Sequence, residues 1–189
     1  MVATETLNNL TEHGSLNHTY TNSTACESKM CLNALHEVLS STTDGCDSDY
    51  CMEEAKILDF GAGQGQLGQM LADKGFNQVY AQEGSNAKKQ MLKTKGIYKD
   101  IETFIVGKQG LPPAYRRKFD IVTCATSLGT NLLPSKSFED MLLALKSGGF
   151  VVFTVSHKHL VEGNSFNMGY QQAIERLIQK GSWRPVSHR

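Results

Sequence analysis

Short apolar runs alternate with amphipathic stretches along most of the chain. The runs are rich in β-branched and aromatic side chains, a composition typical of strands. The amphipathic stretches repeat apolar residues every three or four positions, as one face of a helix does, and a glycine follows several of them. The pattern predicts strands over 56–60, 78–82, 103–106, 119–125 and 150–155, and helices over 66–74, 85–94, 137–146 and 166–180.

Strands that alternate with helices predict a particular architecture. Their connections favour parallel pairing through right-handed crossovers, and continuous apolar strands suit a sheet covered on both faces. We therefore expect an α/β fold, a three-layer sandwich with a mostly parallel central sheet. Such sheets bind ligands beyond the carboxyl ends of their strands, so the residues after each strand carry the candidate chemistry.

The N-terminal part of the chain has a different character. Residues 1–23 are polar and rich in Thr and Asn, without a sustained period, which predicts a flexible tail. Thr24 and Glu27 fit a helix-capping box. The apolar face that follows comprises Met30, Cys31, Ala34, Leu35, Val38 and Leu39. We expect a flexible polar tail over 1–23 and a single domain over 24–189.

Composition narrows the function classes. Lys+Arg and Asp+Glu both number 19, so the chain exerts no long-range attraction on nucleic acid or anionic lipid. We expect neither as a partner. No run approaches the roughly 20 apolar residues that span a bilayer, and no secretory signal is visible, which predicts a cytoplasmic protein. The cysteine pairs 26/31 and 46/51 are borderline for zinc, and we expect no metal site.

A glycine-rich turn follows the first predicted strand, in the sequence Asp59-Phe60-Gly61-Ala62-Gly63-Gln64-Gly65. Glycines at alternate positions allow a tight turn and let a ligand approach backbone N–H groups. Residues 63–68 also match the dinucleotide pattern G-x-G-x-x-G, so an NAD-dependent enzyme is one alternative. The carboxylate of Asp59 suits a cationic ligand better than a pyrophosphate. Glu83 ends the second strand, where an acidic residue can accept from ribose hydroxyls.

Three segments in order resemble motifs of class I (Rossmann-like) S-adenosylmethionine-dependent methyltransferases. Residues 57–65 resemble motif I, residues 118–122 the fourth-strand motif, and residues 145–150 the L-K-P-G-G-x turn, with Ser147 replacing proline. The chain is most similar to the Williams–Beuren syndrome region methyltransferase-like proteins, over about residues 28–183.

The resemblance implies S-adenosylmethionine as cofactor and assigns roles to several residues. Gly61, Gly63 and Gly65 would line the methionine part, and Asp59 would hold its ammonium group. Glu83 would bind the ribose, and adenine recognition would fall to backbone or to Gln109. The complete expected cofactor-binding set is Asp59, Gly61, Ala62, Gly63, Gly65, Glu83, Gly84, Ser85 and Gln109.

The methyl acceptor is expected to be a small molecule or a protein side chain. Methyl transfer from a sulfonium mainly requires alignment, with a base only where the nucleophile needs one. The candidate catalytic residues follow strands four and five: His157, His159 and Asn131, with Thr126 and Ser127 beside the last. The alternative from another class is a non-catalytic cofactor-binding or interaction module.

The chain departs from the resemblance at its C-terminal end. Relatives run on into two further strands beside strand five, and this sequence reaches Arg189 before both. We therefore expect a sheet truncated before its last two strands. The open edge would favour self-association or a partner, because unpaired strand edges attract further strands.

Overall fold

The computed structural model of the chain describes residues 2–7, 16–42, 54–160, 163 and 165–188. Seven strands form one sheet in the order β4-β3-β2-β5-β6-β1-β7, and every described pair is parallel. The strands are β1 (Val2–Leu7), β2 (Lys56–Phe60), β3 (Gln78–Gln82), β4 (Ile101–Glu102), β5 (Phe119–Cys124), β6 (Leu145–Ser156) and β7 (Pro185–His188). The helices are α1 (Leu16–Thr42), α2 (Gln66–Asp73), α3 (Asn86–Lys95), α4 (Ser137–Ala144) and α5 (Tyr170–Gln179), with 3-10 turns η1 (Pro113–Tyr115) and η2 (His157–His159).

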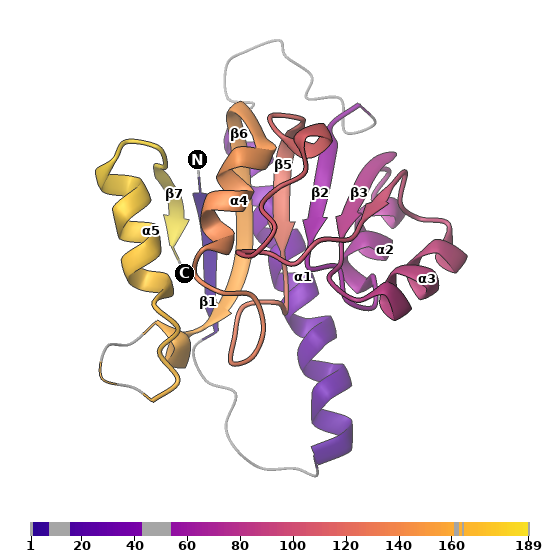
Figure 1. The fold of residues 1–189 in the computed structure, drawn as a ribbon, viewed down its shortest axis with the longest axis horizontal. Coiled ribbons are helices and arrows are strands. Elements are labelled where there is room, and N and C mark those ends of the chain that lie inside the picture. Colours follow the sequence, from indigo (N-terminus) through magenta and orange to yellow (C-terminus); the bar gives the residue numbers. More distant parts are fainter. Residues whose placement is uncertain (1, 8–15, 43–53, 161–162, 164, 189) are drawn as a thin grey trace.

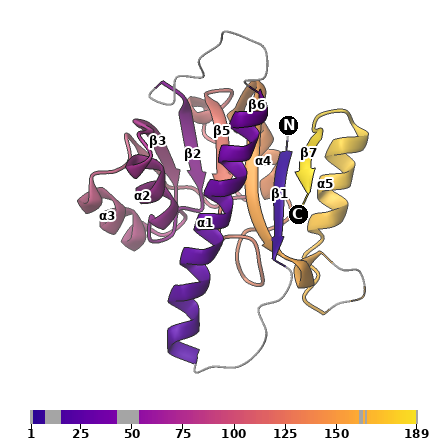
Figure 2. The same ribbon diagram turned by 180° about the vertical axis from the view of Figure 1, so that it is seen from behind.

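Helices cover both faces of the sheet (Figures 1 and 2). α4 and α5 contribute Phe138, Tyr170 and Leu177 to a core with one face of β5 and β6. On the other face, α1 and α2 pack through residues that include Leu35 and Leu71. The expected three-layer α/β architecture with a parallel central sheet is therefore confirmed. Its central strands are buried apolar runs because both of their faces are covered.

The third predicted strand is wrong in its position. β4 comprises only Ile101 and Glu102, which pair with the end of β3, and residues 103–106 leave the sheet. Phe104 and Val106 are nevertheless buried in the core, so their apolar character reflects the packing of a loop against the core and not a strand. A short apolar run does not distinguish these two situations.

The N-terminal segment differs from the expected flexible tail over 1–23. Val2–Leu7 form β1, and helix α1 begins at Leu16 instead of at the capping box of Thr24. Residues 16–23 contain neither Gly nor Pro, so nothing in them stops the helix from extending N-terminally. The predicted apolar face of this helix is confirmed, since Cys31, Leu35 and Val38 are buried against the sheet and α2.

The expected open edge beside strand five, now β6, is wrong for the described residues. β1 pairs in parallel with β6 from Val2↔Val151 to Leu7↔Ser156, and β7 pairs with β1 in turn. The physical reason is that the N–H and C=O groups of β6 need partners, and the segment Val2–Leu7 carries the β-branched residues that suit a strand. The edge of β6 is therefore not a free surface for self-association or a partner. Among the described helices, none is long and apolar enough to cross a membrane.

Candidate functional site

The glycine turn connects β2 to α2 at the carboxyl end of the sheet. Gly61, Gly63 and Gly65 have φ of 77°, 56° and 75°, in the left-handed region that favours glycine. A Cβ on Gly61 would lie 2.6 Å from the Ser127 Oγ, whereas one on Gly63 would meet nothing closer than 3.8 Å. The turn is therefore packed against the loop after β5 at its first glycine and open toward a ligand at its second.

Glu83, directly after β3, is fixed by the backbone around it. Its Oε2 accepts from the Gly63 N–H at 2.9 Å, and its Oε1 accepts from the Ser85 N–H at 2.9 Å. Only 7% of the residue is exposed. A carboxylate offers about four acceptor positions, so two such bonds leave capacity for further donors. Glu83 is therefore a preorganised anionic acceptor beside the glycine turn.

Asp59 is also buried, but it is engaged elsewhere. The Tyr98 hydroxyl donates to Asp59 Oδ2 at 2.7 Å, and Asp59 is not among the residues that line the pocket described below. Burial raises the pKa of Asp59 from 3.8 to about 6, although the hydrogen bonds from Tyr98 and the Gly68 backbone oppose this shift and nearby Glu83 adds to it. The position expected to hold an ammonium group thus faces Tyr98.

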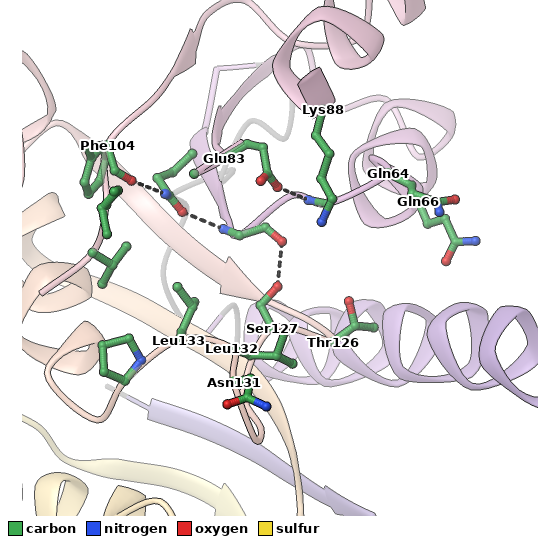
Figure 3. A pocket seen from close by; sticks show the side chains of 17 residues that line it. Gln64, Gln66, Glu83, Lys88, Phe104, Thr126, Ser127, Asn131, Leu132 and Leu133 are labelled. Carbon is green, nitrogen blue, oxygen red and sulfur yellow. Dashed lines mark hydrogen bonds between the residues drawn. The ribbon is translucent and has the colours of Figure 1, made fainter. Parts of the chain in front are cut away.

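A pocket of about 540 Å³ opens at the carboxyl ends of β2, β3 and β5 (Figure 3). One wall is apolar and the opposite side carries polar groups from the starts of α2 and α3. Glu83 and Lys88 are its titratable lining residues in the described part of the chain. The full lining comprises Gly61, Gly63, Gln64, Gln66, Gln82, Glu83, Gly84, Lys88, Phe104, Ile105, Val106, Thr126, Ser127, Asn131, Leu132, Leu133 and Pro134.

Of the expected cofactor-binding residues, the pocket brings together Gly61, Gly63, Glu83 and Gly84. The others support it from outside. Gly65 is buried, and a Cβ there would lie 2.7 Å from Leu92. Ser85 caps α3 by accepting from the Lys88 N–H, and Ala62 packs against the small core formed by Ala81, Leu92 and Ile101. Gln109 Oε1 accepts from the Ile105 N–H at 2.9 Å, so it shapes the segment that forms the apolar wall.

The three catalytic candidates separate in the structure. Asn131 lines the pocket with a φ of 61°. His157 is exposed at the start of η2, and His159 is buried with its Nδ1 2.9 Å from the Phe166 carbonyl oxygen. Neither histidine lines the pocket. Both remain catalytic candidates only as predictions from the sequence.

The loop after β5 is held in place by Tyr170 of α5. The Tyr170 hydroxyl donates to the Leu133 carbonyl at 2.6 Å and accepts from the Gly129 N–H at 2.9 Å. Tyr170 is fully buried. Through these hydrogen bonds to the backbone of Gly129 and Leu133, the Tyr170 hydroxyl fixes the part of the pocket wall that carries Asn131 and Leu133.

Several lining residues were missed from the sequence, notably Gln82, Phe104 and Leu133. Gln82 donates from Nε2 to the Phe104 carbonyl at 2.9 Å, and its Oε1 accepts from the Gly61 N–H at 3.0 Å. Its position at the end of a strand that faces the glycine turn was the available signal. Within the described residues, no group of three or more His, Cys, Asp or Glu side chains could hold a metal ion. Cys46 and Cys51, the second of the two cysteine pairs weighed as zinc ligands, lie outside the described residues.

The sequence model of the DREV methyltransferase family matches residues 30–183. The expected closeness to the Williams–Beuren region proteins is not confirmed by this match. No curated protein sequence matches the chain.

Several solved structures are similar to this chain at low sequence identity. A TehB-like SAM-dependent methyltransferase from Corynebacterium glutamicum is 18% identical with a TM-score of 0.50, covering 79% of this chain and 83% of that one. A SAM-dependent methyltransferase from Mesorhizobium loti is 22% identical with a TM-score of 0.46, covering 56% and 49%. One from Thiobacillus denitrificans, in complex with S-adenosyl-L-homocysteine, is 16% identical with a TM-score of 0.40, covering 52% and 41%.

The first of these structures spans most of both chains and supports the Rossmann-like methyltransferase fold, and the matched motif region contains the glycine turn and Glu83. With a family match over most of its length, this chain belongs to the DREV methyltransferase family.

Proposed function

We propose that the chain binds S-adenosylmethionine in the pocket at the carboxyl ends of β2, β3 and β5 and transfers its methyl group to a small-molecule or protein acceptor. The observation that carries this proposal is the Glu83 carboxylate, which the Gly63 and Ser85 N–H groups hold at the pocket wall. An anionic acceptor beside an open glycine turn suits a nucleoside ribose next to a cationic amino-acid moiety.

The two ends of the pocket differ in chemistry. Phe104, Ile105 and Val106 form an apolar wall that suits the faces of an adenine ring. Gln109 supports this segment through Ile105 and does not line the pocket, so the proposed adenine contacts come from the backbone and apolar side chains of the wall. The glycine turn lies at the other end, where Gly63 has open space beside it that suits the methionine part.

When bound, S-adenosylmethionine supplies an electrophilic methyl group on a sulfonium. The titratable lining residues in the described part of the chain are Glu83 and Lys88, and Lys88 enters from α3 beside Glu83 (Figure 3). The side that carries Thr126 and Asn131 is neutral. These residues can orient an acceptor and exclude water but are poor general bases at neutral pH, so the proposed contribution of the chain is alignment.

The cellular setting is part of the same proposal. We expect a cytoplasmic location, the usual compartment for a reduced thiol such as that of the buried Cys124. The chain's balanced charge argues against nucleic acid as the acceptor. The choice of methyl acceptor would depend on the loop after β5, which contributes Thr126, Ser127 and Asn131 to the pocket, because binding residues commonly lie on loops.

Two measurements on the purified chain test this function. Calorimetric titration should give saturable binding of S-adenosylmethionine and S-adenosylhomocysteine and none of NAD; binding of NAD alone would overturn the proposal. Incubation of the chain with tritium-labelled S-adenosylmethionine and a cell extract should then label a protein or small-molecule fraction, and a boiled sample should not. Cofactor binding without any labelled product would favour the non-catalytic binding module.

A further inference from the structure

Three hydrogen bonds join four separate segments across the floor of the pocket. The Gln82 Nε2–H donates to the Phe104 carbonyl at 2.9 Å, and the Gly61 N–H donates to Gln82 Oε1 at 3.0 Å. The Ser127 hydroxyl donates to the Gly61 carbonyl at 2.6 Å. Figure 3 shows these bonds in one continuous line. We refer to Phe104, Gln82, Gly61 and Ser127 as the brace.

The brace is buried at Gln82 and Phe104. Gln82 is 1% exposed and Phe104 is 3% exposed, so the side-chain amide between them has little access to water. Its two polar ends are both satisfied, one as donor and one as acceptor. A neutral amide supplies both functions across this span, whereas an ionised carboxylate only accepts and an ammonium group only donates.

The packing around Gly61 ties the brace to the glycine turn. A Cβ on Gly61 would lie 2.6 Å from Ser127 Oγ, so the close approach of the serine depends on glycine at this position. The Gly61 and Ala62 N–H groups also donate to the Gln82 backbone carbonyl, each at 3.0 Å. The start of the turn therefore has its position set by β3 on one side and by the loop after β5 on the other.

The four segments joined by the brace form different parts of the pocket. Phe104 belongs to the apolar wall, Gly61 begins the turn, and Ser127 lies in the loop that carries Asn131. A shift of one segment must lengthen a short bond or move the next segment. The brace thus fixes the distance between the adenine side and the acceptor side of the pocket.

We propose that Gln82 and Ser127 are positioning residues that act through Gly61 and couple the cofactor turn to the acceptor-side loop. This inference rests on the proposed function, since it assigns the two sides of the pocket to cofactor and acceptor. Both residues exert their effect by holding backbone, so their loss loosens the turn and the wall together.

The sharpest perturbation is Gln82→Glu, which preserves the shape of the side chain. At about pH 8 the ionised carboxylate can accept from Gly61 but opposes the Phe104 carbonyl, so S-adenosylhomocysteine should bind roughly tenfold more weakly than to the wild type. At about pH 5.5 a buried, protonated carboxyl group donates as the amide did, and much of the affinity should return. Because other titratable groups lie nearby, with Asp59 on the adjacent strand β2 and Glu83 and Lys88 in the pocket lining, each value is taken relative to the wild type at the same pH.

The matched control is Gln78→Glu, the same chemical change at the opposite end of β3. It should bind S-adenosylhomocysteine within about twofold of the wild type at both pH values. Its behaviour separates the effect of an added charge on the strand from the effect on the brace. Equal weakening in the two variants would overturn the proposal.

A second readout needs no ligand. Amide hydrogen exchange of residues 61–65 in the free chain should be faster in Gln82→Glu and in Ser127→Ala than in the wild type. The double variant should lose less affinity than the sum of the single losses, since both act on Gly61. Exchange rates equal to those of the wild type in both single variants would overturn the proposal that the brace holds the glycine turn. Failure of the wild type to bind S-adenosylhomocysteine would instead overturn the proposed function, and the exchange rates would still decide whether the brace holds the turn.

Discussion

Replacement of Glu83 by glutamine gives the clearest single-residue prediction for the pocket. In the folded chain both carboxylate oxygens accept backbone N–H bonds of 2.9 Å, from Gly63 and Ser85. The amide of Glu83→Gln can accept only one of them and turns its NH₂ toward the other N–H. One unpaired donor at a site that is 7% exposed costs about 1–3 kcal/mol, so the free energy of unfolding should fall by about that amount.

Cofactor affinity should fall as well. If the ribose hydroxyls donate to Glu83, the substitution removes hydrogen bonds to a charged acceptor, each contributing about 1.5–3 kcal/mol. The dissociation constant for S-adenosylhomocysteine should therefore rise roughly 10- to 100-fold by calorimetry. The control is Glu102→Gln, the same change at the end of β4, outside the pocket lining. A dissociation constant for Glu83→Gln equal to that of this control would refute the assignment of Glu83 to the ribose.

Three further predictions concern the groups around the pocket. Gly68→Ala should lower the free energy of unfolding by about 1–3 kcal/mol in urea denaturation, because its Cβ would collide with the Tyr98 hydroxyl, and an unchanged value would contradict that contact. Burial raises the Asp59 pKa from 3.8 to about 6, so the folded chain binds more protons than the unfolded chain in this window. The wild type should therefore lose about 3 kcal/mol of stability relative to Asp59→Asn as the pH rises from about 4 to 7, and parallel profiles would show that Asp59 is not perturbed. Tyr170→Phe should speed amide hydrogen exchange at Gly129, whose N–H loses its partner, and unaltered exchange would mean that the hydroxyl does not hold the loop.

The sequence predicted the parts of the fold that local chemistry decides. The strands at 56–60 and 78–82 are confirmed at both ends, because they are apolar runs bounded by a glycine turn and by a capping serine. Gly96 ends α3 in the left-handed conformation, as expected of a glycine after a helix. The prediction of a strand over 103–106 was wrong because a loop that packs into the core requires the same apolar residues as a buried strand.

The N-terminal strand β1 could not be predicted from the local sequence. Nothing in the composition of Val2–Leu7 reveals that it pairs with β6, whose sequence lies about 150 residues away. The same limit applies to the site. Glu83 could be predicted as a candidate from its spacing to the glycine turn, whereas the contacts of Gln82 and Tyr98 join segments far apart in the sequence.

Asp59 shows why a motif does not define a contact. Its place before the glycine turn favoured a direct role with the ammonium group, but its carboxylate accepts from Tyr98 in the closed interior. This hydrogen bond depends on the path of residues 96–100, which places the Tyr98 side chain against Gly68 and beside Asp59. A sequence pattern fixes the backbone position of such a residue and leaves the direction of its side chain open.

The central claim is that the glycine turn and Glu83 form the cofactor site of this methyltransferase. An NMR titration of the ¹⁵N-labelled chain with S-adenosylhomocysteine tests it most directly, because glycine amide signals report on the turn itself. We expect saturable shifts of the Gly61, Gly63 and Glu83 amides, with little change at Gly163 and Gly181, which do not line the pocket. Saturable shifts that leave Gly61, Gly63 and Glu83 unmoved would contradict it.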